Sequence, residues 1–139
     1  MFKLASFALF ALVSSLPLAQ AAAPSKAVFK GNYDGIARLE TVTGESFSYS
    51  PLRFKISKVG VITGTAYNSK SMVLSKVTGK INKVTVKYGI SFVGKAFGKF
   101  SDGTKWTAEV SAQRGQTGKT ISGNARQGAY SGRIIMTNQ

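Results

Sequence analysis

The sequence contains no cysteine and no histidine, and it has only 5 acidic residues against 19 basic ones. Without cysteine the chain forms no disulfide, carries no thiolate nucleophile and offers no sulfur ligand to zinc or iron–sulfur clusters. Without histidine it lacks the commonest general base and the commonest metal ligand. These absences weigh against most metal sites and most nucleophilic enzymes.

The first 21 residues have the three-part pattern of a secretory signal peptide. Lys3 supplies the positive charge, an apolar run extends from Leu4 to Leu16, and small residues surround Ala21. The run is shorter than the roughly 20 residues of a membrane-spanning helix, so we expect cleavage and no span in the mature chain. We predict a signal peptide at 1–21, a short tail at 22–27 and one domain at 28–139. Bacterial-type export, to the periplasm or out of the cell, fits the absence of cysteine.

Apolar and polar side chains alternate with a period of two through most of the remaining chain. The clearest segment is KWTAEVSA at 105–112, and similar alternation occurs at 54–57, 83–87, 120–125 and 130–136. This period is typical of strands that bury one face. Inward-facing positions predict a core made of Phe54, Ile56, Val84, Val86, Phe92, Trp106, Val110 and Ile134.

Turn-forming residues separate these segments at intervals of 8–12 residues. We expect turns at 43–45, 58–60, 68–70, 79–82, 101–103 and 115–118, of which Asp102-Gly103 is the strongest hairpin signal. The spacing predicts an all-β, single-domain antiparallel meander of roughly 8–10 strands. We expect a small closed or nearly closed barrel, with a β-sandwich as the alternative. The pattern resembles glycine-punctuated β meanders of bacterial secreted and surface proteins, and no functional residue follows from that resemblance.

Two short segments at opposite ends of the domain share the pattern G-x-Y-x-G. They are GNYDG at 31–35 and GAYSG at 128–132. Glycines four residues apart lie on the same face of a strand, where they mark bends or close backbone approach. We therefore predict that the first and last strands pair and close the sheet.

The search for catalytic chemistry yields no site. Asp34 and Glu40 share a strand face but lie too far apart for a carboxylate dyad, and Asp102 belongs to a turn. The segment GQTGKT at 115–120 lacks the spacing of a phosphate-binding loop. We expect no enzyme, no metal and no cofactor, although serine and lysine are abundant enough that a Ser–Lys pair stays open.

Positive charge is the strongest functional signal in the sequence, with a formal net charge of +14. Such an excess attracts polyanions and acidic surfaces. Consecutive strands usually neighbour each other, so several lysines and one aromatic residue are expected on adjacent strands. The candidate ligand-binding residues are Lys83, Lys87, Lys95, Phe97, Lys99 and Lys105.

The favoured function is an exported, non-enzymatic β module that binds an anionic polymer or the cell envelope surface. The polymer would be an acidic glycan, a cell-envelope polymer or a nucleic acid. One alternative is a structural or matrix module whose lysines only protect the strands and keep the protein in solution. The other alternative is a barrel that holds a small ligand in its interior.

Overall fold

The computed structural model describes residues 25–86 and 89–139 of the chain. The predicted signal peptide at 1–21 therefore lies outside the described residues. Within them, a 3-10 helix precedes eight strands, in the order η1 (Lys26–Phe29), β1 (Gly31–Glu40), β2 (Ser46–Ile56), β3 (Val61–Asn68), β4 (Val73–Thr85), β5 (Ser91–Phe100), β6 (Lys105–Arg114), β7 (Thr120–Gln127) and β8 (Tyr130–Asn138).

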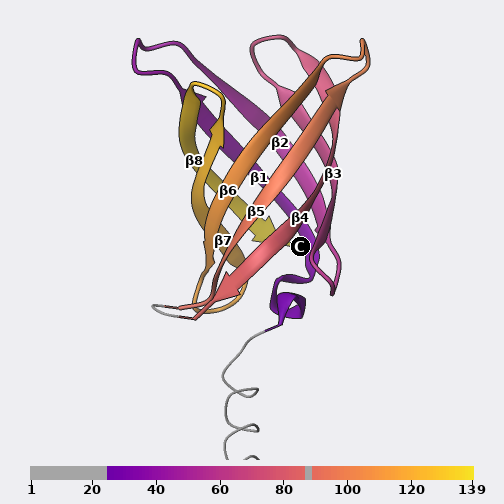
Figure 1. Cartoon of the computed structure of the whole chain (residues 1–139), viewed down its shortest axis with the longest axis vertical. Helices are drawn as coiled ribbons and strands as arrows, with labels where there is room; N and C mark the ends of the chain where they lie inside the picture. Colours follow the sequence, from indigo (N-terminus) through magenta and orange to yellow (C-terminus); the bar gives the residue numbers. More distant parts are fainter. Residues whose placement is uncertain (1–24, 87–88) are drawn as a thin grey trace, which may run out of the picture.

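The strands form a closed antiparallel barrel in which each pairs with its neighbours in sequence (Figure 1). β1 closes the barrel against β8, in a register that runs from Tyr33 opposite Asn138 to Glu40 opposite Ser131. The predicted all-β meander and the pairing of the first and last strands are thus confirmed. One detail was wrong, because Gly128 lies with φ +61° in the turn before β8 and is not part of a strand face.

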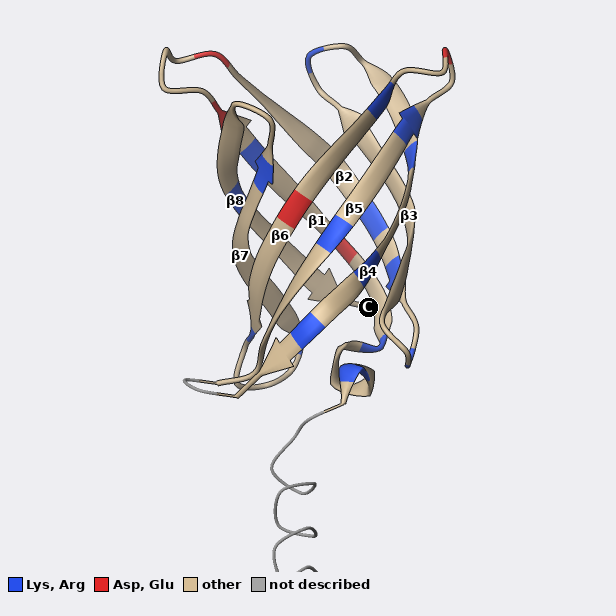
Figure 2. Ribbon diagram, viewed as in Figure 1, with Lys and Arg blue, Asp and Glu red and all other residues tan. Residues whose placement is uncertain are grey.

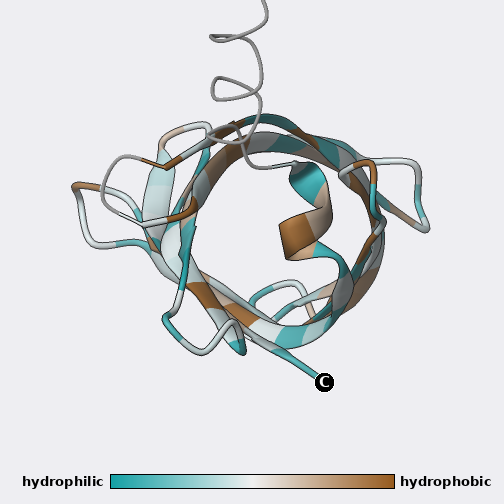
Figure 3. Cartoon of the chain, turned by 90° about the horizontal axis from the view of Figure 1, so that it is seen from below, coloured by the Kyte–Doolittle hydropathy of each residue, from teal (hydrophilic) through white to brown (hydrophobic). Residues whose placement is uncertain are grey.

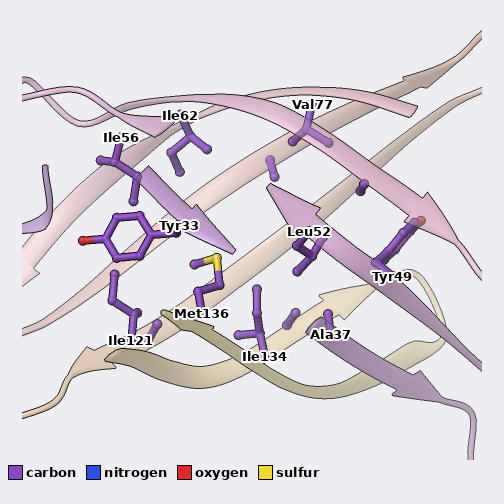
Figure 4. Packing of buried hydrophobic residues seen from close by; sticks show 14 of the residues in the cluster. Tyr33, Ala37, Tyr49, Leu52, Ile56, Ile62, Val77, Ile121, Ile134 and Met136 are labelled. Atoms are coloured by element: carbon purple, nitrogen blue, oxygen red, sulfur yellow. The ribbon is translucent and has the colours of Figure 1, made fainter. Parts of the chain in front are cut away.

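The interior is filled by side chains from every strand (Figure 4). Among the predicted core residues, Ile56, Phe92 and Ile134 are buried, whereas Phe54, Val84, Trp106 and Val110 are partly buried and pack against the core. Val86 was predicted wrongly, since it follows the end of β4 and is 49% exposed. An eight-stranded barrel is just wide enough for such side chains to fill.

Glycines on the inner face let large side chains lie directly on the neighbouring backbone. Gly98 is paired with Trp106, and a Cβ at Gly98 would lie within 1.9 Å of the indole ring. Gly64 is paired with Phe54, and a Cβ there would lie 1.9 Å from the carbonyl oxygen of Arg53. The absence of a Cβ at these positions allows the sheet to curl tightly around its core.

The turn predicted at 79–82 does not exist, because β4 continues through it. Gly79 is paired with Ala96, and a Cβ at Gly79 would lie 2.2 Å from the carbonyl oxygen of Lys95. This glycine therefore marks close approach of two strands and not a reversal of the chain. A register shift between Ile81 and Lys83 gives β4 its local irregularity.

Helix η1 lies within the rim of the barrel at the end that is lowest in Figure 1, and Figure 3 looks into this end. Phe29 is fully buried and makes an edge-to-face contact with Phe92, with ring centroids 4.8 Å apart. The hydroxyl of Tyr33 donates a hydrogen bond of 2.7 Å to the carbonyl oxygen of Phe29. Phe29, which precedes β1, is therefore part of the core.

Aromatic side chains pack together toward the opposite end. Phe47 contacts both Tyr49 and Tyr130 edge to face, and Tyr49 stacks on Trp106 with centroids 5.1 Å apart. The indole nitrogen of Trp106 donates to the hydroxyl oxygen of buried Ser75 at 3.3 Å. Both ends of the interior thus have aromatic residues whose polar atoms are hydrogen-bonded.

We expect Trp106→Ala to lower the free energy of unfolding by about 3 kcal/mol, because it removes the contacts with Tyr49 and uncovers Gly98. Urea titration followed by circular dichroism measures the change. Phe97→Ala is the matched control, since Phe97 is exposed on the outer face and its loss should cost less than about 0.5 kcal/mol. Equal losses in the two variants would contradict the inward assignment of Trp106.

Stability should also depend on pH through Tyr33. Burial raises the pKa of its hydroxyl above the ordinary value of 10.0, and the charge of Arg114 opposes this to a smaller extent. The folded state therefore holds this proton more tightly than the unfolded state, so the contribution is complete below about pH 10 and is lost as the pH rises through the folded pKa. In urea titrations from about pH 9 to about pH 11.5, Tyr33→Phe should lose stability less steeply than the wild type. Parallel curves would contradict the prediction.

Candidate functional site

Six lysines are exposed on the outer face of three consecutive strands. We call this set the lysine strip; it comprises Lys76, Lys80 and Lys83 of β4, Lys95 and Lys99 of β5, and Lys105 of β6. Figure 2 shows basic positions recurring along β4 and β5 with one acidic position on β6. The inward side chains of the same strands belong to the core, so the alternation of each strand holds the lysines outward.

The register places several of these lysines directly opposite one another. Lys99 pairs with Lys76 on one side and with Lys105 on the other, and Lys80 pairs with Lys95. Like charges in directly opposed positions destabilise a sheet by a few tenths of a kcal/mol to about 1 kcal/mol per pair. We therefore expect the opposed lysines of the strip to lower the stability of the barrel.

Phe97 lies in the middle of the lysine strip and is 46% exposed. Its directly opposed neighbours are Thr78 on β4 and Thr107 on β6. Lys95 and Lys99 lie two residues to either side on the same strand face. The strip therefore presents an exposed aromatic ring with a lysine two residues away on either side along the strand, a combination suited to a ligand with both anionic groups and flat apolar surfaces.

Five of the six residues predicted from the sequence lie on this surface, namely Lys83, Lys95, Phe97, Lys99 and Lys105. Lys83 lies on the same outer face, opposite Val93 and beyond the register shift. Lys87 lies outside the described residues.

Two members of the strip were missed, Lys76 and Lys80. The predicted turn at 79–82 had divided the strand that carries both. The alternation of Val77 and Ile81 with the lysines around them was the signal that could have identified one continuous strand.

The acidic side chains near the strip are engaged with arginines. Glu109 lies opposite Lys95 in the sheet and accepts a hydrogen bond of 3.3 Å from Arg126. Away from the strip, Asp34 of β1 lies 3.8 Å from Arg53 of β2. Exposed pairs of this kind contribute little to stability, and they leave the lysines of the strip as the dominant charge on this side of the barrel.

Asp102 belongs to the turn between β5 and β6. Its carboxylate accepts a hydrogen bond of 2.8 Å from the backbone N–H of Thr104, and this bond lowers the pKa of Asp102. That is the local role expected of aspartate in a turn. Among the described residues, no three acidic side chains lie close enough together to hold a metal ion.

The interior of the barrel has little free space. Two apolar voids between core side chains measure about 20 and 40 Å³. Pockets that hold small organic ligands usually measure about 300–1,000 Å³. The geometry therefore favours the outer surface over the interior as the place for a ligand.

None of the described helices has the length and apolar character that crossing a membrane requires. Comparison with protein-family models, with curated proteins and with solved structures found no match for this chain.

Reversing the charge of Lys99 should stabilise the barrel. Lys99→Glu turns two like-charge pairs into opposite-charge pairs, so we expect the free energy of unfolding to rise by about 0.5–1 kcal/mol at low ionic strength. The gain should shrink in about 1 M salt, because exposed charges are then screened beyond about 3 Å.

The matched control is Lys55→Glu on β2, whose opposed residues, Asn32 and Thr63, are uncharged. The same gain in both variants would mean that only the net charge of the protein matters and that the register of the strip does not.

Proposed function

We propose that the chain is an exported, non-enzymatic β module that binds an anionic polymer through the lysine strip. The observation that carries the proposal is the cross-strand opposition of Lys76, Lys99 and Lys105 beside an exposed Phe97. This arrangement costs folding stability, and an anionic ligand would relieve the repulsion between the lysines.

Two further observations support an outer-surface function. The core is filled, so the strands serve as a rigid scaffold for the residues on their outer faces. Charged side chains occupy mid-strand positions on the outer face, where a barrel surrounded by lipid carries an apolar band. The proposed binding face therefore meets water and whatever anionic material is dissolved or anchored nearby.

The positive charge of the strip comes from lysine and not from arginine, and this determines the kind of binding that we expect. An ammonium group is a compact point charge on a flexible chain, whereas arginine presents a planar fork for two parallel hydrogen bonds. A strip of lysines therefore suits a repeating anionic polymer better than one uniquely shaped anion. The material that this proposal favours is an acidic glycan, a cell-envelope polymer or a nucleic acid.

The affinity of such a complex must fall steeply with salt, because each contact releases counterions from the polymer. With about four lysines engaged, log affinity for a single-stranded oligonucleotide should fall with a slope near −3 against log salt, at about 0.7 per contact. A heparin-like sulfated polymer should show a similarly steep decrease. Fluorescence anisotropy over a range of salt concentrations measures both slopes.

The variant that tests the location of the site replaces Lys76, Lys80, Lys95 and Lys99 by Gln together. Its control replaces four exposed lysines away from the strip, Lys30, Lys58, Lys70 and Lys119, with the same change in net charge. Lys26 is left out of the control because its side chain packs near Gly60. The strip variant should flatten the salt slope more than the control does. Equal flattening would mean diffuse attraction by net charge, and no binding at about 0.15 M salt would favour the structural module.

A further inference from the structure

A row of three threonines and one phenylalanine crosses the lysine strip at right angles to the strands. Thr63, Thr78, Phe97 and Thr107 are successive cross-strand partners on β3, β4, β5 and β6, and all four are exposed. We call them the central row. Neighbouring strands lie about 4.8 Å apart, so the row places one side chain at each such interval. That interval is close to the length that one sugar ring adds to an extended polysaccharide.

Lysines flank the central row on both sides. Lys76, Lys99 and Lys105 are cross-strand partners and form the first lysine row. Lys80 and Lys95 form the second lysine row, whose next position, on β6, is Glu109, paired with Arg126 at 3.3 Å. The two rows are four residues apart along each strand, or about 13 Å at about 3.3 Å per residue. Long cationic side chains thus stand on either side of a floor of threonines.

The surface is hollowed where the central row reaches β6. A depression of about 280 Å³ lies there, lined by Thr107 and by Lys95, Glu109 and Arg126 among others. It continues from the central row toward β7 and is open to solvent. The central row therefore leads into this depression at β6.

We propose that the ligand is a linear acidic polysaccharide that lies along the central row, with carboxylates projecting from both edges of the chain toward the two lysine rows. This inference rests on the proposed function and specifies its ligand. In an extended chain of uronic-acid units, successive carboxylates project to opposite edges, which matches cations on both sides of one floor. The threonine hydroxyls provide hydrogen-bond donors and acceptors for sugar hydroxyls, and the face of Phe97 provides an apolar surface for the C–H face of a ring.

A single-stranded nucleic acid fits this arrangement less well. Such a strand carries its phosphates along one edge and stacks successive bases on successive aromatic side chains. Here threonines occupy the other positions of the central row, and the second lysine row would face bases and not phosphates. The two-sided charge therefore favours the polysaccharide.

The first experiment compares three probes with the full mature protein by isothermal titration calorimetry at low salt. They are polygalacturonate, its methyl ester, which keeps the sugar chain but removes the charge, and a single-stranded oligonucleotide of matched charge. We expect polygalacturonate to bind more tightly than the oligonucleotide and the ester not to bind measurably. Tighter binding of the oligonucleotide would overturn the inference while leaving the proposed function in place.

The second experiment separates the two lysine rows. Lys76 and Lys99 are replaced by Gln in one variant, and Lys80 and Lys95 in another, so that each loses two charges. Both variants should weaken polygalacturonate binding on the order of tenfold at low salt. A loss confined to one row would indicate a ligand charged on one edge and would overturn the inference.

Phe97 provides a test that does not depend on charge. Phe97→Ala should weaken polygalacturonate binding severalfold with an unchanged salt slope, and Phe97→Tyr, which retains the ring, should restore it. Thermal unfolding of each variant establishes that the barrel is intact. Unchanged binding in a folded Phe97→Ala protein would overturn the placement on the central row. Equal losses in the four-lysine strip variant and its control would instead remove the proposed function itself.

Discussion

The structure depends on the fit between inward glycines and the large side chains opposite them. Closing eight strands leaves an interior about as wide as the side chains that fill it, so backbones must approach closely wherever a bulky residue points inward. Trp106 over bare Gly98 and Phe54 beside Gly64 satisfy this condition. A methyl group at either glycine would meet an indole ring or a carbonyl oxygen, so the curvature of the barrel and the packing of its core are a single requirement.

Because glycines and large side chains fill the interior together, we place any binding function on the outer surface. Phe29 closes one end of the core, and the Tyr49–Trp106 pair packs toward the other, with Tyr49 donating a hydrogen bond of 2.9 Å to Gln127. No buried side-chain nitrogen or oxygen among the described residues lacks a hydrogen-bond partner. A filled and satisfied interior makes a stiff scaffold, and stiffness is what allows exposed side chains to hold a fixed spacing.

The period-two alternation and the glycine pattern were sufficient to predict the all-β meander and its closure by β1 and β8. The core was predicted less completely, because alternation assigns a face but not a depth: Val86 follows the alternation yet lies past the end of β4. Gly79 shows the main ambiguity, since one residue type serves both turns and close strand approach. Only the strand register distinguishes a glycine in a turn from a glycine at a close approach of two strands. Because Gly79 was assigned to a turn, Lys76 and Lys80 were left out of the predicted site.

The strand register also arranges the positive charges in a pattern that cannot be inferred from composition alone. A net charge of +14 could be spread evenly over a barrel, where the lysines would mainly provide solubility. On these three strands, the pairing of β5 with β4 and with β6 aligns lysines into two rows and leaves threonines and Phe97 between them. Spreading the same charge would have avoided the repulsion between Lys76, Lys99 and Lys105, and the core does not require lysine at any outward position. The fold therefore does not require the loss of stability that this repulsion causes. Binding of an anionic ligand with charges on both edges is a physical reason for lysines to occupy these positions.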